Sequence, residues 1–168
     1  MNQKTLTFTL SLILCCVAFI VRDSFLSFSI AKITGKTVLF NESWKLPYQI
    51  LPTIVFIFSI GIIPYLYLLI KKTCRINSVQ KQVGSAGIII NSGLLFYSLR
   101  LVYLKIKASQ INDLLQRAEF ISQDNIPTIR LEDMYLEFYF LMGLLVGTVV
   151  SFIIYRKNIL TSQVNKGF

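Results

Sequence analysis

The sequence predicts an all-α membrane protein with four transmembrane helices, a short outer β-hairpin and an outer amphipathic helix. The first observation is composition: mean hydropathy is +0.63, 54% of the 168 residues are apolar and 15% are charged. A soluble domain typically carries about 25% charged residues to cover its water-facing surface. The second is that four apolar runs approach the length of a bilayer crossing, and the third is that polar or basic residues flank each run.

The four runs define the predicted spans. A bilayer core about 30 Å thick needs roughly 20 apolar helical residues, because each residue adds about 1.5 Å along the axis. All four belong to one membrane domain, and they cover residues 5–21, 50–70, 83–104 and 136–155 of the 1–168 chain.

The first and second spans each contain a feature that affects how the run is interpreted. A cleaved signal peptide is the alternative for the first run, but the bulky residues from Cys16 to Arg22 offer no small-residue cleavage site. We therefore favour an uncleaved span. In the second run, Pro64 lacks a backbone N–H and predicts a bend in the helix.

The distribution of charge predicts the orientation. The charged residues of segments 1–4, 71–82 and 156–168 are all basic, whereas all 8 acidic residues lie in other segments. Positive residues beside a span resist translocation across the membrane. We therefore expect a multi-pass protein of the cell (inner) membrane with both termini in the cytoplasm.

The two longer segments on the outer side each predict an element. Residues 29–33 and 37–40 are β-prone runs on either side of a turn at Gly35, which favours a hairpin. In the second segment, apolar residues recur at three-and-four spacing, as in an amphipathic helix that extends the third span outward. These apolar residues are Ile111, Leu114, Leu115, Ala118 and Ile121, with Asn125 and Pro127 ending the helix.

Small and polar residues inside the third and fourth spans are the candidate contact positions. Small residues let membrane helices approach closely, and a mid-span amide favours a partner because an unsatisfied amide in hydrocarbon is costly. Packing of the two spans on each other is one interpretation, and a self-association seam or a ligand site is the other. The residues are Gly87, Asn91 and Ser98 in the third span and Gly143, Gly147 and Ser151 in the fourth.

Arg100 is a candidate of a different kind. It lies about one turn inside the outer end of the third span. An intramembrane charge is a functional candidate by default, but a long basic side chain at this depth reaches the headgroups. We therefore interpret Arg100 as a structural anchor.

The sequence lacks the residue types and spacings that catalysis within a membrane or metal binding would need. The chain has no His, no CxxC spacing and no acidic residue at the centre of a span, so we expect no metal, no cofactor and no enzymatic activity. Cys15, Cys16 and Cys74 are interpreted as small apolar residues. The bases lie beside apolar runs rather than on one wet face, which argues against nucleic acid as a partner.

The layout resembles a family of small four-span inner-membrane proteins of Bacteroidota. The resemblance rests on the basic second connection with Lys71-Lys72, Arg75 and Gln80, on Asn91-Ser92-Gly93-Leu94, and on the segment after the first span. That family implies no activity or site residues. We expect a structural, accessory or partner-binding subunit of a bacterial inner-membrane assembly, contacting lipid and other membrane proteins or itself. The alternative is an oligomeric carrier or channel for a small molecule or lipid, which would require a polar cavity around Asn91, Ser98 and Arg100.

Overall fold

The computed structural model describes residues 3–33, 50–76, 78–117 and 134–164, and every regular element in these ranges is a helix. Four helical segments in the described part are long and apolar enough to cross a membrane, and they contain the four predicted spans. The helices are α1 (Gln3–Ile33), α2 (Ile50–Gly61), α3 (Ile63–Thr73), α4 (Val79–Arg117) and α5 (Leu136–Val164).

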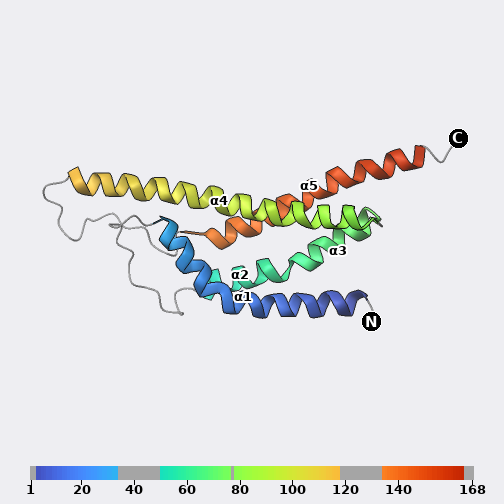
Figure 1. The fold of residues 1–168 in the computed structure, drawn as a ribbon, viewed down its shortest axis with the longest axis horizontal. Coiled ribbons are helices and arrows are strands. Elements are labelled where there is room, and N and C mark those ends of the chain that lie inside the picture. The colour runs from blue at the N-terminus through green and yellow to red at the C-terminus, as the bar shows by residue number, and fades with distance from the viewer. Residues whose placement is uncertain (1–2, 34–49, 77, 118–133, 165–168) are drawn as a thin grey trace.

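The helices pack as neighbours in two main pairs. Helix α4 packs along α5, α1 packs along α2, and α2 also contacts α5 (Figure 1). The start of α1, the end of α5 and the turn between α3 and α4 all lie at one end of the bundle. We call this the terminal end. The start of α1 and the end of α5 therefore lie at the same end of the bundle.

The predicted bend in the second span is confirmed as a break between α2 and α3. Pro64 has no N–H, and the Tyr65 N–H donates to the Ile62 carbonyl at 2.9 Å instead of to that of Gly61. The Gly61 carbonyl is thereby released from the helix. The Ser11 hydroxyl of α1 donates to it at 2.6 Å, so the freed polar group is satisfied by a neighbouring helix, as hydrocarbon requires.

The predicted outer hairpin is wrong in its first arm. Helix α1 continues through Arg22 as far as Ile33, so residues 29–33 are helical. The reason is packing: Leu26, Ile30 and Ile33 recur at helical spacing and are all buried. Burial of this stripe overrides the β-propensity of the individual residues. The turn and the second arm, residues 34–40, lie outside the described residues.

The predicted amphipathic extension of the third span is helical as far as the structure describes it. It forms one helix with the span, because α4 runs without interruption to Arg117. The buried face of the extension carries Leu104, Ala108 and Ile111, whereas Leu114 is 60% exposed. The predicted positions Ala118, Ile121, Asn125 and Pro127 lie outside the described residues.

Candidate functional site

The closest helix contact near the candidate residues is the interface between α4 and α5, which we call the seam. A Cβ atom placed on Gly143 would lie 2.5 Å from the Ser92 carbonyl oxygen, and one on Gly147 would lie 2.9 Å from the Ile89 Cα. Both contacts involve backbone that cannot rotate away. The two glycines therefore allow the backbones to touch, which is how membrane helices gain van der Waals contact.

A buried polar contact extends the same seam toward the terminal end. The Ser151 hydroxyl donates to the Ser85 Oγ at 3.0 Å, and both side chains are fully buried. On the α4 side, Gly93 faces Phe140 and Leu144 of α5, each of which would lie 2.9 Å from an added Cβ. The seam thus uses Gly93 of α4 rather than Gly87.

The other α4 candidates lie away from α5. Asn91 and Ser98 are exposed, and a Cβ on Gly87 would meet nothing within 4 Å. Asn91 lies two residues from Ile89 and from Gly93, a rotation of about 200° around the helix in each direction. The structure therefore brings together Gly143, Gly147 and Ser151 with α4, but it leaves Gly87, Asn91 and Ser98 on the opposite side of that helix.

Four buried polar residues, Arg22, Ser29, Tyr97 and Glu137, form what we call the Arg22–Glu137 cluster. They come from α1, α4 and α5, and each is at most 8% exposed. The Arg22 guanidinium donates to the exposed Asp23 carboxylate at 2.9 Å and lies near enough to Glu137 to interact with it electrostatically. A basic side chain of α1 and an acidic side chain of α5 are thus both buried, although an unpaired buried charge would be costly.

Tyr97 and Ser29 join α4 to α1 within this cluster. The Ser29 hydroxyl donates to the Phe25 carbonyl at 2.7 Å, so its single proton is used and Tyr97 Oη, 2.9 Å away, is the donor to Ser29 Oγ. Phe25 packs between the rings of Phe56 and Tyr97, with centroid distances of 4.7 and 5.1 Å. A polar contact and an apolar stack therefore fix the same junction.

Arg100 holds the chain at the start of α5. Its Nε donates to the Met134 carbonyl at 2.9 Å. The guanidinium also lies over the rings of Tyr103 and Tyr139, 5.1 and 4.9 Å from their centroids. Such cation–π contacts contribute about 0.5–1 kcal/mol at exposed sites. The arrangement is that of an anchor at a helix junction.

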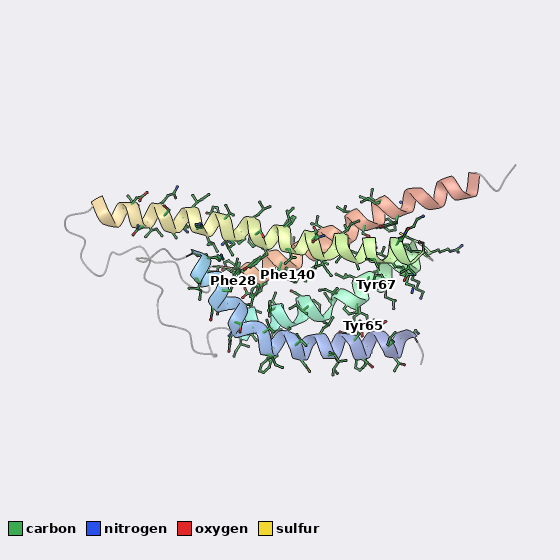
Figure 2. The ribbon with its side chains drawn as sticks, in the orientation of Figure 1. Phe28, Tyr65, Tyr67 and Phe140 are labelled. Carbon is green, nitrogen blue, oxygen red and sulfur yellow. The ribbon has the colours of Figure 1, made fainter. Side chains whose placement is uncertain are left out.

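The depth of these charges follows from helix geometry. Arg22 lies about 27 Å along α1 from Lys4, and Arg100 lies about 26 Å along α4 from Val83. In a membrane whose hydrocarbon core, about 30 Å thick, began at Lys4 and Val83, both residues would lie near the edge farther from the terminal end. Phe28 and Phe140 lie farther from the terminal end than Tyr67 does (Figure 2).

The turn between α3 and α4 is fixed by a second, smaller polar network. The Tyr67 hydroxyl donates to Gln82 Oε1 at 2.9 Å, and Gln82 Nε2 donates to the Ile76 carbonyl at 3.2 Å. Cys74 is 5% exposed in this turn. Burial raises the pKa of the Cys74 thiol, which keeps it neutral and weakly nucleophilic near pH 7.

Sequence reasoning missed Arg22 and Glu137 as interior residues. Both lie next to span boundaries, where charge is ordinarily wetted, and only the packing of the helices on one another buries them. The signal for Arg22 was the apolar stripe of Leu26, Ile30 and Ile33 that continues beyond it. Within the described ranges, no group of three or more His, Cys, Asp or Glu could hold a metal ion. Chemically, the cluster can hold helices together.

No family model, curated protein or solved structure matches this chain. The class of the molecule therefore rests on its own features, which are four helical segments long and apolar enough to cross a bilayer, three of which contribute buried polar residues to one cluster.

Proposed function

We propose that this chain is a structural, accessory or partner-binding subunit of a bacterial inner-membrane assembly. The observation that carries the proposal is the outer part of α4, residues 105–117, which extends beyond the other helices at the end opposite the terminal end (Figure 1). We call it the α4 projection. Arg117 lies about 51 Å along the helix from Val83, well beyond a hydrocarbon core about 30 Å thick.

The side chains of the α4 projection support a role in binding another protein. Leu114 is 60% exposed and Ile106 is 55% exposed. An apolar side chain that faces lipid needs no partner, but one held outside the hydrocarbon meets water. Covering it by another protein would recover about 25 cal/mol for each Å² of apolar surface. The bond between Tyr97 and Ser29 supports the same role, because it joins α4 to α1 and would help to present the projection rigidly.

The remaining parts of the proposal come from the sequence. The bacterial inner membrane follows from the resemblance of the layout to the four-span Bacteroidota family, and cytoplasmic termini follow from the basic segments at the terminal end. An oligomeric carrier or channel receives less support. That function would require Asn91, Ser98 and Arg100 to line one cavity. Arg100 lies two residues from Ser98 and is therefore rotated by about 200° around α4 from it.

Site-specific photocrosslinking in native membranes tests the proposal. A photoreactive amino acid replaces Leu114 in the full chain, and a matched variant carries it at Val149 of α5, which is 57% exposed within the fourth span. We expect a crosslinked protein of one defined mass from position 114 and lipid adducts from position 149. Lipid adducts alone from position 114, or the same protein bands from both positions, would contradict the proposal.

A further inference from the structure

The side of α4 that faces away from α5 carries a polar group for which the described part of the chain offers no hydrogen-bond partner. Asn91 lies about 12 Å from Val83 along the helix, near the middle of a core about 30 Å thick. Its side chain is exposed. Within the part of the chain that the structure describes, no hydrogen bond is made by its amide, which has two N–H donors and one oxygen acceptor.

Hydrocarbon cannot supply what this amide lacks. A lipid tail neither donates nor accepts a hydrogen bond, and an amide transferred into an apolar medium without a partner loses several kcal/mol. The side chain is also too short to reach the headgroups from the middle of the core, unlike a Lys or Arg side chain. Another protein surface at the same depth would satisfy it.

Gly87, one turn away on the same face, is the second observation. For each of the other described glycines, an added Cβ would lie less than 3.0 Å from a neighbouring atom, whereas for Gly87 nothing lies within 4 Å. Its missing side chain therefore leaves the α4 backbone open to close approach beside Asn91. A helix packed there could bring its own backbone near and place a polar group against the amide.

We propose that Gly87, Asn91 and Ser98 form the contact face of a parallel homodimer in which two Asn91 amides hydrogen-bond across the interface. A second copy is the occupant that the chemistry selects. The flanking charges give every copy the same orientation, so a two-fold axis along the membrane normal brings Asn91 of each copy to the same depth. An amide is self-complementary, since each one donates and accepts. This interface is separate from the α4 projection.

Dimerisation of the full chain in vesicles of zwitterionic and anionic phospholipid tests the proposal. Energy transfer between two fluorophore-labelled populations, measured against protein-to-lipid ratio, gives the dissociation constant. We expect Asn91→Leu to weaken the dimer about 3- to 30-fold, and we expect Asn91→Gln, which keeps the amide, to weaken it less. Val149→Leu, a lipid-facing control on α5, leaves the dissociation constant unchanged.

Gly87→Ile gives an independent second test. Because space surrounds Gly87 in the monomer, the variant folds, which circular dichroism checks, but its side chain holds the two helices apart and weakens the dimer. A wild-type chain that stays monomeric at every ratio would overturn the proposal, as would an Asn91→Leu chain that dimerises like the wild type. A monomeric wild type whose position 91 crosslinks to a different protein in cells would also overturn it, in favour of a heteromeric partner. None of these three results bears on crosslinking from Leu114.

Discussion

At the scale of single residues, the polar side chains separate into those that the sequence could locate and those that only the fold defines. Arg100 was predicted as an anchor from its distance to a span boundary, and the structure places it on the Met134 carbonyl. Arg22 and Glu137 stand at equally ordinary positions in the sequence. Their burial depends on contacts between helices that are distant along the chain, about which local patterns carry no information.

The bond between Tyr97 and Ser29 provides a prediction at this scale. Tyr97→Phe should lower the free energy of unfolding by about 1 kcal/mol, because hydrogen bonds between membrane helices average about 0.6 kcal/mol and reach about 1.7 kcal/mol. Sodium dodecyl sulfate titration in mixed micelles, followed by circular dichroism, measures the change. The effects of Tyr97→Phe and Ser29→Ala should not add in the double variant, since both remove the same bond.

Tyr65→Phe is the matched control for this cycle. Tyr65 is 44% exposed, and its hydroxyl makes no hydrogen bond in the described part of the chain, so the variant should unfold within about 0.5 kcal/mol of the wild type. Full additivity of the Tyr97 and Ser29 effects would mean that the two hydroxyls are not coupled, and that the junction of α1 with α4 depends on the aromatic stack alone.

At the scale of helices, the sequence was informative where the cause is local. Pro64 alone removes a backbone donor, so the break between α2 and α3 could be predicted. The end of α1 could not, because residues 29–33 have β-prone composition and become helical only when their apolar stripe is buried. The face of α4 that packs on α5 could not be predicted either, because it too depends on tertiary packing. Gly87 and Gly93 lie on different faces of α4, and the sequence does not say which face meets α5.

A comparison of two glycines tests the seam between α4 and α5. Gly143→Ala should destabilise the protein by about 1–3 kcal/mol, as overpacking does, because the new methyl group would meet the backbone of Ser92 and Gly93. Gly84→Ala is the control. There the methyl group would meet only the hydroxyl at the far end of the Tyr155 side chain, which can move aside. The same unfolding titration should therefore separate the two variants, and equal stabilities would show that α5 does not approach α4 so closely.

At the scale of the whole molecule, orientation combines a geometric and an electrostatic argument. Geometry puts the start of α1, the end of α5 and the turn between α3 and α4 at one end (Figure 1). Which side of the membrane that end occupies is decided by charge, and the basic residues Lys71, Lys72, Arg75 and Lys81 around the turn favour the cytoplasm. The sequence predicts this orientation because the balance of flanking charge is a property of the linear chain.

Cysteine accessibility in intact cells tests the orientation of the full chain. In a background without Cys15, Cys16 and Cys74, Ser78→Cys introduces a thiol at the turn between α3 and α4, and Ser109→Cys introduces one on the α4 projection; both serines are exposed. A maleimide that cannot cross the membrane should label Ser109→Cys in intact cells and both variants after permeabilisation. The substitutions change one atom each and leave every charge in place, so they do not disturb the force that orients the chain. Labelling of Ser78→Cys alone in intact cells would invert the topology, and it would put the α4 projection, with its exposed Leu114, in the cytoplasm.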